Sequence, residues 1–168
     1  MEDCKIGLNN IIAPSALIGK GATIGSFCII GDGVVIGEGA IIKNYVELRE
    51  GTFIGKECYI DSRVSTSGNC IVGAGVTLRY GAIIARRVQI GKGSYLCPNV
   101  MTIYTNHEGE PQNGIVIGQR AFIGTGAVIG GGVTLGDDVI IGALSYVNRD
   151  CPSPGIYMGA PVRFHDLS

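Results

Sequence analysis

Residues 18–37 read IGKGATIGSFCIIGDGVVIG, in which isoleucine recurs at every sixth position and glycine follows it each time. An aliphatic residue keeps this spacing from Ile6 to Leu96, with Thr66 as the single exception, and the pattern resumes from Ile117 to Val147. Four positions after the aliphatic residue stands a small or β-branched one, such as Ala22 or Cys28, and Asn10 is the one misfit. A period of six is neither the 3.6 of a helix nor the alternation of a simple strand. Such a repeat is typical of a solenoid.

The repeat predicts short strands joined by tight corners, with the aliphatic side chains inside. Three hexads form one triangular coil of about 18 residues, and successive coils stack ~4.8 Å apart through parallel strand pairing. We therefore expect an all-β, parallel β-helix of about eight triangular coils in a single domain spanning residues 1–168. The coils occupy residues 6–152, a protruding loop lies near residues 102–116, and a short C-terminal tail covers residues 153–168.

Composition excludes several classes of protein. The formal net charge of −1 and the isoelectric point near 6.1 indicate neither nucleic-acid binding nor attachment to a membrane surface. No apolar run reaches the ~18 residues of a membrane span, and the first residues lack the pattern of a signal peptide, so we expect a cytoplasmic protein. The six cysteines lack metal-site spacing, and four occupy the small position of the repeat, where we expect buried, reduced thiols.

The largest interruption of the six-residue repeat lies between Thr102 and Val116. These fifteen residues stand where two hexads need twelve, so we expect about three extra residues and an outward bulge. The bulge carries His107, one of only two histidines in the chain. An imidazole with a pKa near 6.5 can remove a proton from an attacking hydroxyl or amine at neutral pH. His107 is therefore a candidate general base, and the alternative is a solvated loop histidine.

The chain resembles the hexapeptide-repeat (left-handed β-helix) acyltransferase superfamily over nearly its whole length. IYTNH at residues 103–107 is similar to the histidine-containing loop of the galactoside, maltose and xenobiotic acetyltransferases. IGTGAVI at 123–129 and GVTLG at 132–136 resemble a family motif in which Phe122 replaces the usual tryptophan. IGALSYVNRD at 141–150 and GAPVR at 159–163 resemble the last coil and the terminal turn of the family.

This resemblance implies a left-handed helix, a homotrimer with active sites between subunits, and acetyl-CoA as the acyl donor. It implies that His107 is the general base that activates the acceptor. It also implies that backbone groups of Thr125 and Ala143 contact the pantetheine arm. Asn148 and Arg149 would lie along the coenzyme near its phosphates, and Arg163 would approach the adenosine phosphate. Arginine suits these last positions because its planar guanidinium matches phosphate oxygens.

The acceptor site is less specified. We expect Asn99, just before the loop in sequence, to orient a substrate or the His107 ring. We expect Arg87 and Gln89, one coil below the hexad that carries His107, to line an acceptor pocket at a trimer interface. The acceptor is expected to be a sugar or nucleotide-linked sugar, acylated on oxygen or nitrogen without a metal.

Besides a nucleotide-binding or sugar-isomerising relative on the same prism, two alternatives within the same fold remain open. One is a non-catalytic β-helix subunit that serves as a scaffold or interaction surface. The other is a γ-type carbonic anhydrase, which needs three histidine ligands to zinc, whereas this chain has only His107 and His165.

Overall fold

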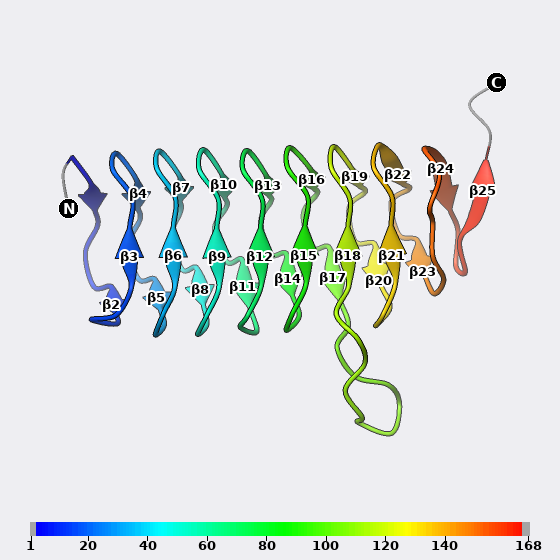
Figure 1. Ribbon diagram of the computed structural model, residues 1–168, viewed down its shortest axis with the longest axis horizontal. Coiled ribbons are helices and arrows are strands. Elements are labelled where there is room, and N and C mark those ends of the chain that lie inside the picture. The colour runs from blue at the N-terminus through cyan, green and yellow to red at the C-terminus, as the bar shows by residue number, and fades with distance from the viewer. Residues whose placement is uncertain (1–2, 166–168) are drawn as a thin grey trace.

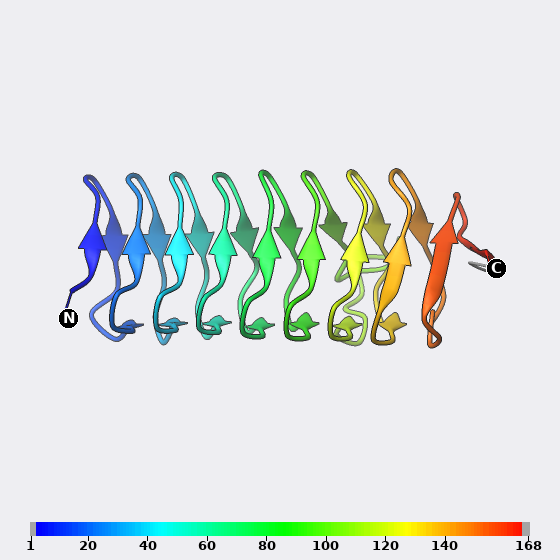
Figure 2. The same ribbon diagram turned by 90° about the horizontal axis from the view of Figure 1, so that it is seen from above.

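The computed structural model describes residues 3–165, which form a left-handed parallel β-helix with three flat faces (Figures 1 and 2). We number the faces as sheets 1, 2 and 3 in the order in which the chain visits them. Sheet 1 contains β1 (Lys5–Ile6), β4 (Thr23–Ile24), β7 (Ile41–Ile42), β10 (Tyr59–Ile60), β13 (Thr77–Leu78), β16 (Tyr95–Leu96), β19 (Phe122–Ile123), β22 (Val139–Ile141), β24 (Gly155–Met158) and β25 (Arg163–His165).

Sheets 2 and 3 are built in the same way from strands of two residues. Sheet 2 contains β2 (Ile11–Ile12), β5 (Ile29–Ile30), β8 (Glu47–Leu48), β11 (Ser65–Thr66), β14 (Ile83–Ile84), β17 (Met101–Thr102), β20 (Val128–Ile129) and β23 (Tyr146–Val147). Sheet 3 contains β3 (Leu17–Ile18), β6 (Val35–Ile36), β9 (Phe53–Ile54), β12 (Ile71–Val72), β15 (Gln89–Ile90), β18 (Val116–Ile117) and β21 (Thr134–Leu135). No helix among residues 3–165 is long and apolar enough to cross a membrane.

The interior consists of the aliphatic residues that set the period of six. Ile24, Ile60 and Leu78 are at most 1% exposed, and the residue before each of them points outward. The small residues of the repeat lie near the corners, and from Ala22 onward they are buried as well. Four cysteines belong to this set, and burial raises the pKa of their thiols above the ordinary value; they are Cys28, Cys58, Cys70 and Cys151.

Strand register shows how much chain the loop inserts. In the coils before it, paired residues are 18 apart, as in Lys5 with Thr23. Across the loop they are 27 apart, as in Tyr95 with Phe122, so nine residues are inserted rather than the expected three. The expectation was wrong because the segment from Thr102 to Val116 replaces one hexad and not two. The coil that contains the loop therefore runs from 96 to 122, and Ile117 lies in sheet 3 rather than at the start of a new coil.

The C-terminal residues close one end of the prism. β24 continues sheet 1 in parallel to β22, and β25 then returns antiparallel beside β24. Tyr157 and Val162 are buried by this turn, with exposed fractions of 6% and 1%. What the repeat indicated as a tail is thus an ordered cap on the last coil.

Candidate functional site

The loop leaves the prism at the edge where the chain passes from sheet 2 to sheet 3, which we call the loop edge (Figure 1). Its two legs run antiparallel, with a bridge between Thr105 and Pro111. The backbone N–H of Gln112 donates to the carbonyl of Tyr104 at 2.7 Å. The loop is therefore a narrow hairpin that projects from the prism.

A buried threonine anchors the base of the loop. Thr102 occupies an aliphatic position of the repeat and is 4% exposed. Its hydroxyl accepts a hydrogen bond from the N–H of Ala85 at 2.6 Å and donates to the carbonyl of Ile83 at 3.2 Å. Thr66, the other threonine in this sheet's interior row, likewise accepts from the N–H of Arg49. In neighbouring coils the corresponding N–H donates to the backbone carbonyl of the aliphatic residue, as Ser67 does to Ile84 at 2.8 Å, so each threonine hydroxyl takes the place of that carbonyl.

A glycine lets the loop fold back against the next coil. A Cβ added at Gly131 would lie 2.6 Å from Cβ of Gln112 and 3.3 Å from the carbonyl oxygen of Ile103. The two loop legs thus meet the prism at a position where no other residue fits without displacement. This close approach holds the loop over the corner that follows β20.

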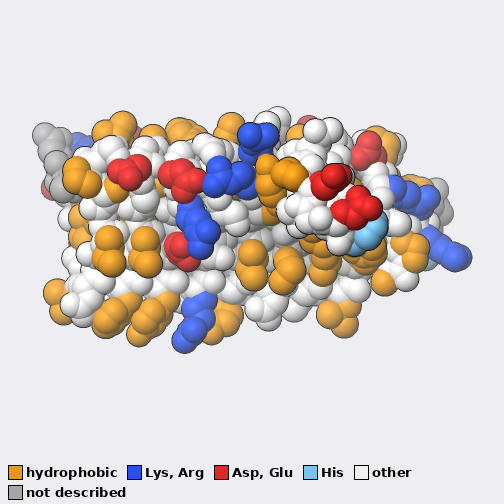
Figure 3. Space-filling model, turned by 90° about the horizontal axis from the view of Figure 1, so that it is seen from below, with side chains coloured by type: hydrophobic (Ala, Val, Ile, Leu, Met, Phe, Trp, Pro, Cys, Tyr) orange, Lys and Arg blue, Asp and Glu red, His pale blue; other side chains and the backbone are white. Residues whose placement is uncertain are grey.

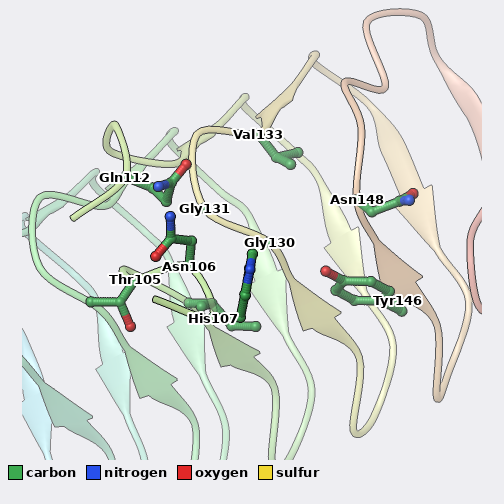
Figure 4. Close-up of a pocket in the computed structure, with 10 residues that line it drawn as sticks. Thr105, Asn106, His107, Gln112, Gly130, Gly131, Val133, Tyr146 and Asn148 are labelled. Carbon is green, nitrogen blue, oxygen red and sulfur yellow. The ribbon is translucent and has the colours of Figure 1, made fainter. Parts of the chain in front are cut away.

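The space between the loop and this corner is a cavity of about 490 Å³ (Figure 4). One wall comes from the loop, the floor from Gly130 and Gly131, and the far wall from β23 and the corner after it. Hydroxyl and amide side chains predominate, and His107 contributes the only imidazole. The lining residues are Ile103, Thr105, Asn106, His107, Gln112, Gly130, Gly131, Val133, Tyr146 and Asn148.

His107 stands at the loop tip in an open position. Its side chain is 90% exposed, and its Nε2 lies 3.9 Å from a carboxylate oxygen of Glu108. Figure 3 shows the loop from its own side, with a histidine next to acidic side chains at its end. An imidazole held this way is accessible both to a molecule in the cavity and to solvent.

The structure brings two of the predicted site residues together, because Asn148 lines the same cavity as His107. Thr125 and Ala143 lie elsewhere, at the edge where the chain passes from sheet 1 to sheet 2. They occupy neighbouring coils there, since the N–H of Leu144 donates to the carbonyl of Thr125 at 2.9 Å. Within one chain, sheet 2 separates this edge from the loop.

The two predicted coenzyme-binding arginines lie near the C-terminal cap. Nη2 of Arg149 donates to the carbonyl of Val162 at 3.2 Å, which ties the last corner to the cap. Arg163 is exposed on β25 in sheet 1. Both guanidinium groups remain accessible to an anion.

The three predicted acceptor residues do not line the cavity. Asn99 is a corner residue with φ of 58° at the edge between sheets 1 and 2, and Arg87 is a corner residue with φ of 62° at the loop edge. Gln89 is exposed on sheet 3. Arg87 and Gln89 lie in the coil before the loop, whereas the cavity lies between the loop and the coils after it.

Sequence reasoning missed Tyr146, Gln112 and the floor of the cavity. Tyr146 could have been found as an outward residue, because it directly precedes Val147 of the aliphatic series. The run Gly130–Gly132 was a second signal, since three consecutive glycines mark a corner that another segment approaches closely. Among residues 3–165 no cluster of three or more His, Cys, Asp or Glu could hold a metal ion.

Comparison with family models gives two matches. The model described as bacterial transferase hexapeptide (six repeats) matches residues 15–50 and 114–149. The model described as hexapeptide repeat of succinyl-transferase matches residues 50–80. None of the curated proteins compared with the chain matches it.

Several solved structures are similar. PerB from Caulobacter crescentus, solved in complex with CoA and GDP-perosamine, is 25% identical with a TM-score of 0.59 over 94% of this chain and 57% of its own. A maltose O-acetyltransferase from Clostridium difficile 630 is 29% identical with a TM-score of 0.64, covering 70% of this chain and 69% of its own. LpxA from Moraxella catarrhalis RH4, 21% identical with a TM-score of 0.66 over 94% and 72%, shares the fold. This chain thus spans little more than half of PerB.

Proposed function

Because this chain belongs to the hexapeptide-repeat acyltransferase superfamily, we propose that it transfers an acetyl group from acetyl-CoA to a hydroxyl or amine of a sugar, with His107 as general base. The observation that carries the proposal is the placement of His107 at the mouth of a cavity lined by hydroxyl and amide groups. Two similar proteins support the choice of substrates. PerB was solved with CoA and a nucleotide-linked sugar, and the other is a maltose O-acetyltransferase.

The proposed reaction is a direct transfer without a covalent enzyme intermediate. The acceptor oxygen or nitrogen attacks the thioester carbonyl while the His107 imidazole takes its proton. The tetrahedral oxyanion is stabilised by backbone N–H groups of the C-terminal coils. It collapses with cleavage of the carbon–sulfur bond, and the imidazolium returns the proton to the departing thiolate. The products are the acylated sugar and coenzyme A.

The separation of the two predicted sites favours a homotrimer. Thr125 and Ala143 lie on a different edge from His107. A neighbouring subunit could present that edge to the loop, so we propose that the coenzyme lies between subunits. Apolar side chains on the outer faces are available for such contacts, since Ile29, Phe53 and Ile71 are 43–49% exposed. Arg149 and Arg163 would then pair with the coenzyme phosphates.

The experiment is a thiol-release assay with purified protein, acetyl-CoA and a panel of glycosides, nucleotide sugars and amino sugars. Replacing His107 by alanine should lower kcat by roughly 10²–10⁴-fold while coenzyme A still binds. His165→Ala is the matched control, because this second histidine is exposed on β25 and should keep wild-type turnover. Turnover that is unchanged in His107→Ala would refute the assignment of the base. A wild-type protein that neither binds coenzyme A nor releases thiol would instead be a non-catalytic subunit.

A further inference from the structure

We propose that Asn106 is a positioning residue whose side-chain carbonyl holds the loop tip in the form that directs His107 toward the cavity. This inference rests on the proposed function, because positioning matters only if His107 acts as the base. Asn106 is half-buried in the loop and directly precedes His107.

Asn106 makes four hydrogen bonds within the tip. Its Oδ1 accepts from the N–H of Glu108 at 3.0 Å and from the N–H of Glu110 at 2.9 Å. Its own N–H donates to the carbonyl of Glu110 at 3.0 Å, and its carbonyl accepts from the N–H of Gly109 at 3.1 Å. Because both side-chain partners are donors, the atom that faces them must be the carbonyl oxygen of the amide. One side chain therefore satisfies two N–H groups of a five-residue turn.

His107 depends on this turn for its orientation. The histidine lies between Asn106 and Glu108, and its 90% exposed side chain has little packing to hold it. Its direction is therefore set by the backbone on either side, which Oδ1 of Asn106 fixes. Without that acceptor, the N–H groups of Glu108 and Glu110 would turn to water and the tip would sample other conformations. A general base that leaves its attack geometry by about 1 Å can lose ~10²-fold in rate.

Asn106 also lines the cavity, so its amide NH2 could instead contact the acceptor directly. The two roles need different atoms. Positioning needs the Oδ1 acceptor, which aspartate keeps, whereas direct contact needs the NH2 donor, which aspartate lacks. Asn106→Asp therefore separates them.

The test compares Asn106→Ala, Asn106→Asp and the matched control Asn113→Ala. Asn113 is the same residue type on the other leg of the same loop. Its backbone carbonyl accepts a hydrogen bond from the N–H of Gly132, and this bond does not need the side chain. We expect kcat to fall 10- to 100-fold in Asn106→Ala, with unchanged affinity for coenzyme A, and to stay within threefold of wild type in the other two. Each kcat is taken on the plateau of that variant's pH profile, so that the added carboxylate does not distort the comparison.

Amide hydrogen exchange at Glu108 and Glu110 gives a readout that does not depend on turnover. Exchange should accelerate in Asn106→Ala and stay slow in Asn106→Asp. The inference is overturned if Asn106→Ala keeps wild-type kcat, if Asn106→Asp is as slow as Asn106→Ala, or if exchange is the same in all variants. An inactive wild-type protein would refute the proposed function, while the exchange data would still decide whether Asn106 orders the tip.

Discussion

Replacing Gly131 by alanine should displace the loop that carries His107 without disturbing the core. The φ angle of Gly131 lies outside the left-handed region, so its backbone can accept a side chain. The new Cβ would stand 2.6 Å from Cβ of Gln112, whereas non-bonded carbons pack at about 3.5–4.0 Å. The loop leg must therefore move outward by about 1 Å. A shift of this size in the segment that carries His107 should lower kcat by ~10²-fold.

The measurement is kcat from thiol release, together with coenzyme A affinity by calorimetry and the free energy of unfolding. The core is untouched, so we expect unfolding to change by no more than about 0.5 kcal/mol. Gln112→Gly removes the opposing Cβ, and in that background Gly131→Ala should have a much smaller effect on kcat. Wild-type turnover in Gly131→Ala, or an equal loss in both backgrounds, would refute the reasoning that the loop rests on this glycine.

Four further outcomes are expected. Thr102→Val removes the hydroxyl that accepts from the buried N–H of Ala85 and donates to the carbonyl of Ile83, so urea denaturation should show a loss of ~1 kcal/mol; no loss would contradict the anchoring role. Arg149→Ala should weaken coenzyme A binding about tenfold by calorimetry, consistent with loss of one charged hydrogen bond, and unchanged affinity would place the phosphates elsewhere. Alkylation of the native protein at pH 8, followed by mass spectrometry, should spare the buried thiols, and rapid labelling of all six would contradict their burial. The buried thiols are Cys28, Cys58, Cys70 and Cys151. Burial raises the pKa of Cys151 from 9.0 to about 11, so the contribution of this protonated thiol to the free energy of unfolding is fully present well below pH 9. The free energy of unfolding should therefore fall as the pH rises from 9 toward 11.

The fold could be predicted because the core of each coil demands one aliphatic residue per hexad. The size of the insertion could not, for a physical reason. All three faces of the prism present the same pattern, so the return of the repeat at Ile117 does not say which sheet the chain has rejoined. Fifteen residues from Thr102 to Val116 fit either one hexad with nine extra residues or two with three, and strand pairing decides for the first.

The candidate site was predictable only in part. The position of His107 in the large break was visible in the sequence, and the family resemblance singled out Asn148, which lines the same cavity. Tyr146 and Gln112 were missed because the cavity arises where the loop meets a later coil, a contact that no local pattern encodes. Asn99 precedes the loop in sequence but lies on another edge of the prism, so within one chain it does not line the cavity, and its expected role stays a prediction.

A crystal structure of the protein with coenzyme A bound is the most direct test of the central claim. We expect the thiol sulfur to enter the cavity under the loop, beside the His107 imidazole, with the phosphates near Arg149 and Arg163. A coenzyme whose sulfur lies on a surface remote from every His107 in the assembly would contradict it.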